Sequence, residues 1–143
     1  MNIKFTLQSL VVTGLLTLAS AASAQVAVIV NPKSPMASMT PEQVAAVFMG
    51  KSNTLPSGAT AAPADLPESA AVREQFYSKA AGKTGAQVKA TWARLTFSGK
   101  ATPPKEMSSA ADVKKFVASN PDAIGYIEKS AVDNTVKVVL IVD

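Results

Sequence analysis

The sequence contains no cysteine and no histidine. Without cysteine there can be no disulfide and no lipid attached to an N-terminal cysteine. Without histidine the usual general base and the most common transition-metal ligand are missing. Together the two absences exclude Ser-His and Cys-His catalysis and the zinc sites built from these residues. A serine–lysine pair would need a buried lysine, whereas the serines next to lysines here lie on a predicted polar helix face and in a predicted loop. We therefore predict that the protein is not an enzyme and needs no cofactor.

Charge is sparse, because Lys, Arg, Asp and Glu make up only 17% of the chain and the formal net charge is +4. The basic residues are dispersed, and Lys114-Lys115 is the one adjacent pair. A nucleic-acid-binding protein gathers its basic residues into a patch or stripe that follows the phosphates. The dispersed pattern argues against a nucleic acid as the partner, and it permits a weak preference for small anions.

Long apolar runs are also scarce, and the one that stands out is N-terminal. Lys4 is followed by a mostly apolar run at residues 5–18 and then by the small-residue sequence Ala22-Ser23-Ala24. This order is typical of a secretory signal peptide, and the run is short for the roughly 20 residues of a membrane-spanning helix. We predict a signal peptide over residues 1–24, leaving one domain at residues 25–143. The mature protein would be periplasmic, soluble and free of a lipid anchor.

Strand-like and helix-like patterns alternate along residues 25–143. Apolar, β-branched runs predict strands, and a Ser or Thr placed before an apolar periodic segment predicts a helix start. The predicted strands are 25–30, 60–64, 123–127 and 136–142, and the predicted helix caps are Thr40, Ser69, Thr84 and Ser109. The alternation favours an α/β domain. Because residues 25–30 and 138–142 are continuously apolar, we expect both to be central strands covered on two faces.

Two features have both a structural and a functional interpretation. Trp92 and Phe97 either belong to the core or line a ligand pocket or docking patch, and helical spacing favours the core. Asn31-Pro32 either ends the first strand with a simple turn or forms part of a hinge, and the turn is favoured. The loop at residues 98–107, with its two adjacent prolines, is expected to be solvated rather than bound to a partner.

The stretch 64-ADLPESAAVREQFY-77 is the candidate binding site. A helix start can hold a small anion with its free backbone N–H groups, and Arg73 lies one turn into the predicted helix. Alternatively, Ser69 only caps the helix, and Arg73 pairs with a nearby acid, for which Asp65, Glu68 and Glu74 are available. The acidic loop favours the second interpretation.

Three blocks of sequence resemble a known family. They are 28-VIVNPKSPMASMTPEQVAAVFMGK-51, 64-ADLPESAAVREQF-76 and 119-SNPDAIGYIEKS-130. In this order and spacing they are similar to the phosphate-binding proteins of ABC importers, within the type 2 periplasmic binding proteins, and specifically to a short, exported form. The resemblance implies an α/β fold, with a mixed sheet flanked by helices, equivalent to one lobe of a two-lobed protein. The segment that would supply the other wall of the cleft is missing.

The resemblance also implies an anion site at Asp65, Ser69, Ala70, Ala71 and Arg73. In the family this loop carries an arginine and then a Ser-Gly-Thr turn that together hold phosphate. Here Asp65 stands at the arginine position, Ser69 matches the serine, and Ala70 and Ala71 replace the glycine and the hydroxyl residue. Since a carboxylate repels an anion, we expect binding at this site to be weak, altered or lost.

The resulting hypothesis is an exported, non-catalytic solute-binding module that binds phosphate or another small oxyanion weakly and works with a membrane transporter. The alternative is a periplasmic interaction domain, for instance the partner of a sensor protein, that has lost ligand binding. The oligomeric state stays open, and it includes a homodimer that rebuilds a cleft from two lobes.

Overall fold

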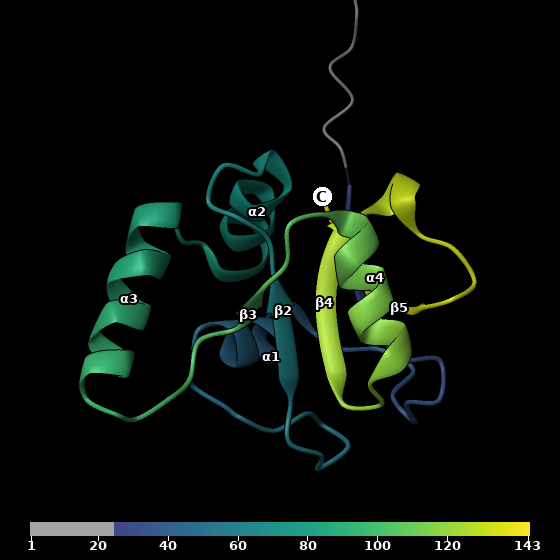
Figure 1. Cartoon of the computed structure of the whole chain (residues 1–143), viewed down its shortest axis with the longest axis horizontal. Coiled ribbons are helices and arrows are strands. Elements are labelled where there is room, and N and C mark those ends of the chain that lie inside the picture. The colour runs from purple at the N-terminus through teal and green to yellow at the C-terminus, as the bar shows by residue number, and fades with distance from the viewer. Residues whose placement is uncertain (1–24) are drawn as a thin grey trace, which may run out of the picture.

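A computed structural model describes residues 25–143 (Figure 1), so the predicted signal peptide lies outside the described residues. Its strands form one five-stranded sheet in the order β3-β2-β4-β1-β5. β1 runs antiparallel to β4 and β5, while β2 runs parallel to β4 and β3. The strands are β1 (Val26–Val30), β2 (Ala62–Asp65), β3 (Lys105–Glu106), β4 (Ala123–Glu128) and β5 (Lys137–Val142). The predicted mixed sheet flanked by helices is confirmed.

The helices begin largely where the capping residues predict. Thr40 and Thr84 each form a complete capping box, and the Ser109 side chain accepts from the backbone N–H of Asp112. Ser69 is the exception, because the N-cap of its helix is Ala70, which makes no side-chain cap bond. A turn in which Ala70 N–H donates to Pro67 O delays the helix by one residue. The helices are α1 (Pro41–Phe48), α2 (Ala71–Phe76), α3 (Gly85–Phe97) and α4 (Ala110–Ser119), with a π-helical turn η1 (Tyr77–Ala81) and a 3-10 turn η2 (Lys129–Ala131).

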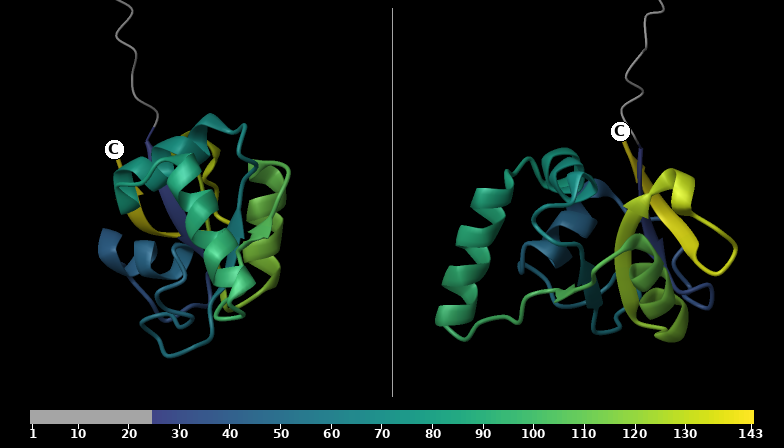
Figure 2. Two further views of the ribbon diagram at one scale, coloured as in Figure 1. Left: turned by 90° about the vertical axis from the view of Figure 1, so that its left-hand side faces the viewer. Right: turned by 45° about the horizontal axis from the view of Figure 1, so that its top comes forward.

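The helices lie on both faces of the sheet. α4 packs against one face, and α1, α2 and η1 cover the other (Figure 2). α3 stands apart from the sheet, at the left of Figure 1, and the chain returns from it through β3. None of the helices in the described part of the chain is long and apolar enough to cross a membrane.

The core on the α1–α2 face is built around four aromatic rings. Phe76 stacks on Tyr126 with ring centroids 4.0 Å apart, and Phe48 meets both rings edge-on. Tyr77 completes the cluster with edge-on contacts to the other three rings. Such pairs contribute about 0.5–1.5 kcal/mol each beyond the area they bury, so this aromatic cluster fixes how α1, α2 and η1 sit on β4.

The prediction of two central apolar strands is half right. Every residue of β1 is at most 1% exposed, but β5 is an edge strand with Ile141 36% exposed. The outer edge of β5 is covered by the connection at residues 31–40 instead of another strand. Met39 N–H donates to Val139 O at 2.9 Å, and Lys137 Nζ donates to Ser34 O. A loop thus covers an apolar run that resembles a central strand.

Asn31 begins the turn that follows β1. Its side-chain amide donates to the carbonyls of Val117 and Ala118 at 3.0 and 3.1 Å, and its side-chain oxygen accepts from Lys33 N–H. These bonds fasten the end of β1 to the end of α4, where the final carbonyls of a helix have no partner within the helix. The predicted turn is confirmed.

Candidate functional site

The predicted anion-binding loop contains a carboxylate that faces inward. Asp65 ends β2 and is 6% exposed. One carboxylate oxygen accepts from Leu66 N–H at 2.9 Å and from the Tyr126 hydroxyl, and the other accepts from the Tyr77 hydroxyl at 2.5 Å. The carboxylate therefore accepts three hydrogen bonds, from its own loop, from η1 and from β4.

The two tyrosine hydroxyls are held as permanent donors. Burial, reinforced by the negative charge of Asp65, raises the pKa of Tyr77 and of Tyr126 far above the usual value of about 10. The positive charge of Arg73 acts in the opposite direction on the pKa of Tyr77, with a smaller effect. Protonated hydroxyls that are fully buried need an acceptor, and Asp65 supplies it.

Arg73 also turns into the protein, and it is 9% exposed. Its guanidinium donates to Leu66 O at 3.2 Å and lies 5.4 Å from the centre of the Tyr77 ring. Its Nε is buried without a hydrogen-bond partner. The predicted ion pair of Arg73 with a nearby acid is wrong, since the ion pairs within residues 25–143 are Lys89–Glu68 and Lys114–Asp133. The Asp65 carboxylate accepts hydrogen bonds from the two tyrosine hydroxyls instead.

The other three predicted residues lie at the surface. Ser69, Ala70 and Ala71 line a small cavity of about 370 Å³ together with Ser108, Ser109 and Glu128. The hydroxyls could bind a polar group, but the Glu128 carboxylate opposes an anion. The structure therefore divides the predicted set. Asp65 and Arg73 point into the core, and the Ser69-Ala70-Ala71 segment borders a separate hollow.

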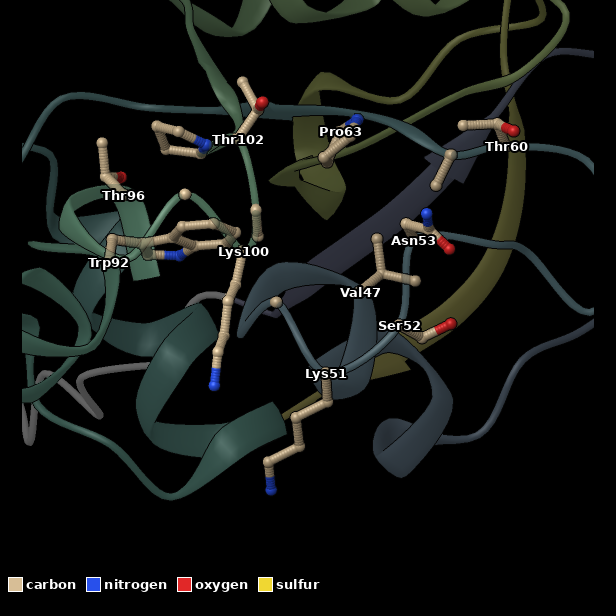
Figure 3. Close-up of a pocket in the computed structure, with 15 residues that line it drawn as sticks. Val47, Lys51, Ser52, Asn53, Thr60, Pro63, Trp92, Thr96, Lys100 and Thr102 are labelled. Carbon is tan, nitrogen blue, oxygen red and sulfur yellow. The ribbon is translucent and has the colours of Figure 1, made fainter. Parts of the chain in front are cut away.

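A larger cavity, of about 900 Å³, lies between α3 and the body of the protein. Its walls come from the end of α1, the connection from α1 to β2, β2 itself, α3 and the loop that leaves α3 (Figure 3). The lining residues are Val47, Gly50, Lys51, Ser52, Asn53, Thr60, Ala61, Pro63, Trp92, Thr96, Gly99, Lys100, Ala101, Thr102 and Pro103. We call this the α3 cavity.

The charges around the α3 cavity are of one sign. Lys51 and Lys100 belong to its lining, and no aspartate or glutamate does. Both lysines are exposed, and Figure 3 shows their side chains extending toward the same side. Each follows a glycine of positive φ just beyond a helix, Gly50 after α1 and Gly99 after α3. A lysine at a helix C-terminus also interacts favourably with the helix dipole, which gives the same residues a structural role.

Trp92 packs against the core, as the helical spacing favours, and it also forms part of the cavity wall. The residue is half-buried, and its indole N–H donates to Phe48 O at 2.9 Å. Gly50 makes this approach feasible, because a Cβ there would lie 2.6 Å from Leu95 Cδ1 and 3.0 Å from the Trp92 ring. Phe97, in contrast, is 96% exposed, so the preference for a core position is wrong for this residue. Helical spacing shows which residues share a face, but not whether that face meets a core or a cavity.

Comparison with known proteins adds information on the fold. No protein-family model matches the chain, and no curated protein matches it significantly. Solved structures do match. A putative phosphate ABC transporter substrate-binding protein with bound phosphate from Clostridium perfringens aligns with a TM-score of 0.64 and 21% identity, over 81% of this chain and 45% of that one. The chain has the fold of half a phosphate-binding protein.

Two further structures agree. An ABC-type phosphate transport receptor from Vibrio cholerae aligns with a TM-score of 0.64 and 21% identity, over 81% of this chain and 46% of that one. PstS from Borrelia burgdorferi aligns with a TM-score of 0.59 and 15% identity, over 81% of this chain and 47% of that one. This chain spans less than half the length of these phosphate-binding proteins. At such identities the likeness establishes the architecture and confirms the resemblance at that level, while function has to be argued from the site.

Proposed function

We propose that the protein is an exported, non-catalytic binding module that takes a small anionic solute into the α3 cavity. One observation carries the proposal: the wall of this cavity holds two lysines and no carboxylate. The fold supports it, since the solved structures that share the fold include a phosphate transport receptor and a putative substrate-binding protein with bound phosphate. Export rests on the predicted signal peptide.

The charges favour weak binding. A unit charge 4 Å from an anion is worth about 1 kcal/mol in water and about 4 kcal/mol near a protein surface. Lys51 and Lys100 are exposed, so the lower value applies, and a Kd of 1 mM already requires about 4.1 kcal/mol. The hydroxyls of Thr60, Thr96 and Thr102 can add hydrogen bonds, each worth about 0.5–1.5 kcal/mol net. Binding in the millimolar range, weakened by salt, is the expected result.

Titration calorimetry with phosphate and sulfate, at low and at high salt, tests the proposal. We expect binding at low salt in the wild type and at least a tenfold loss of affinity in the double variant Lys51→Ala/Lys100→Ala. The matched control is Lys83→Ala/Lys115→Ala, which removes the same charge at two exposed lysines outside the cavity wall. An equal loss in both double variants would show a general charge effect and refute a site in the cavity.

The same titration separates the α3 cavity from the predicted loop-helix site. Ser69→Ala removes the hydroxyl that borders the smaller hollow and leaves the lysines in place. A loss of phosphate affinity in this variant, with none in the lysine variant, would place the anion at the loop-helix instead. Mass spectrometry of protein recovered from the periplasm tests export, and the expected mass is that of a chain that begins at Gln25.

The alternative role in protein interaction is favoured by one observation, the 96% exposure of the large apolar side chain of Phe97. Such a side chain at the end of α3 could pack against a partner or a second copy of the chain. Light scattering of the wild type and of Phe97→Ser, with and without phosphate, would show self-association that depends on this residue. A monomeric wild type under all conditions would exclude a homodimer.

A further inference from the structure

We infer that the solute of the α3 cavity is an organic anion with a flat apolar ring, such as an aromatic carboxylate, and not a bare oxyanion. This inference rests on the proposed function and deepens it. Three properties of the cavity carry the inference: its size, the surface that Trp92 offers, and the combination of apolar residues with two lysines in its wall.

The size of the cavity excludes a good fit to a bare oxyanion. Phosphate has five heavy atoms and displaces a few water molecules of about 30 Å³ each, on the order of 100 Å³ in total. The α3 cavity is about 900 Å³, within the range of roughly 300–1,000 Å³ typical of pockets for larger organic ligands. A phosphate ion here would remain largely hydrated, and most of the wall would not touch it.

Trp92 offers its ring system and nothing else. The indole has a single polar group, the N–H, and that group already donates to Phe48 O at 2.9 Å. What remains for the cavity is the aromatic surface, which is held in place by this bond and by the close approach of Gly50. A fixed aromatic surface favours a flat apolar partner that can stack or meet it edge-on.

The rest of the wall complements an anion that carries such a ring. Apolar surface comes from Val47, Ala61, Pro63, Ala101 and Pro103. The positive charges lie at two points, Lys51 and Lys100, on the two loops that follow α1 and α3. A ligand with one apolar ring and one carboxylate or sulfonate matches this combination, because the ring can cover apolar surface while the charge stays near a lysine and water.

The chain contains one tryptophan, so its intrinsic fluorescence reports directly on the α3 cavity. The experiment titrates the purified protein with 1-naphthoate, acetate, phosphate and the neutral analogue 1-naphthylmethanol, following Trp92 emission and, in parallel, binding heats. N-acetyltryptophanamide in place of the protein corrects for absorption and collisional quenching. We expect 1-naphthoate to change the emission saturably and to bind at least tenfold tighter than acetate, phosphate or the neutral analogue.

Each outcome tests the inference of an aromatic anion, the proposed function, or both. If phosphate and acetate bind as well as 1-naphthoate, the inference is overturned and the proposed function stands. If the neutral analogue binds as well as 1-naphthoate, the charge is irrelevant and the inference is overturned. If no anion binds, both claims fail. Trp92→Leu, followed by calorimetry, should lower naphthoate affinity to that of acetate, and Trp92→Phe should restore part of it. The ligand comparison in the wild type decides even where a Trp92 variant fails to fold.

Discussion

Replacing Asp65 should destabilise the protein more than replacing either tyrosine that donates to it. Tyr77→Phe removes one hydroxyl–carboxylate hydrogen bond, and bonds to charged groups contribute about 1.5–3 kcal/mol. Asp65→Ala leaves the hydroxyls of Tyr77 and Tyr126 in the core, where both residues are fully buried. Each buried donor without an acceptor costs about 1–3 kcal/mol, and Leu66 N–H loses an acceptor as well. Leu66 N–H keeps the Tyr126 hydroxyl as an acceptor, so the two hydroxyls dominate and the expected total is about 2–6 kcal/mol, a large part of the 5–15 kcal/mol that stabilises a typical domain.

The same reasoning predicts that the effects are not additive. In Asp65→Leu/Tyr77→Phe/Tyr126→Phe the two hydroxyls and the carboxylate disappear together, and such an exchange for apolar groups is often close to neutral. Leu66 N–H, which donates to both Asp65 and the Tyr126 hydroxyl, is the one buried donor of this group that is left without an acceptor. The triple variant should therefore be more stable than Asp65→Ala alone. The Asp65/Tyr77 pair by itself should show a coupling free energy of about 1–3 kcal/mol in a double-mutant cycle.

Urea unfolding followed by circular dichroism measures these free energies, provided that the slope of the transition is unchanged among variants. Ser78→Ala, at an exposed position beside Tyr77, is the control and should change the stability by less than about 0.5 kcal/mol. If Tyr77→Phe costs no more than this control and the single effects add up, the carboxylate–hydroxyl bonds do not hold this part of the core together.

Three further predictions concern the stability at alkaline pH, Gly125 and Asn31. Because burial raises the folded-state pKa of both tyrosines, their contribution is fully present below about pH 10 and falls above it, by about 1.4 kcal/mol per pH unit for each. Urea unfolding at alkaline pH should show this slope, and the double phenylalanine variant should lack it. Gly125→Ala should cost about 1–3 kcal/mol, since a Cβ would lie 2.6 Å from Val113 Cγ1. Thermal unfolding measures the loss, which Val113→Ala should partly relieve. Asn31→Ala should cost about 1–3 kcal/mol and speed hydrogen exchange at the end of α4, and unchanged exchange would contradict the role given to Asn31.

Much of the fold could be predicted from the sequence because its signals are local. The caps at Thr40, Thr84 and Ser109 act within three residues, and each was found where the pattern indicated. β1 and β4 are short apolar runs between turn residues, and they too lie where predicted. Ser69 shows the limit of such signals, since a turn that returns to Pro67 moved the cap to Ala70.

Only the tertiary structure decided which segments meet. The Asp65 carboxylate accepts hydrogen bonds from the hydroxyls of Tyr77, 12 residues away, and of Tyr126, 61 residues away. No local pattern specifies such pairs. Likewise β5 became an edge strand, and the face of α3 that carries Trp92 became the wall of a cavity. The sequence by itself determined where most helices and strands form, and its lack of histidine and cysteine narrowed the chemistry. Packing determined which charged groups lie in the core and which line a cavity, because these positions depend on surfaces brought together from distant parts of the chain.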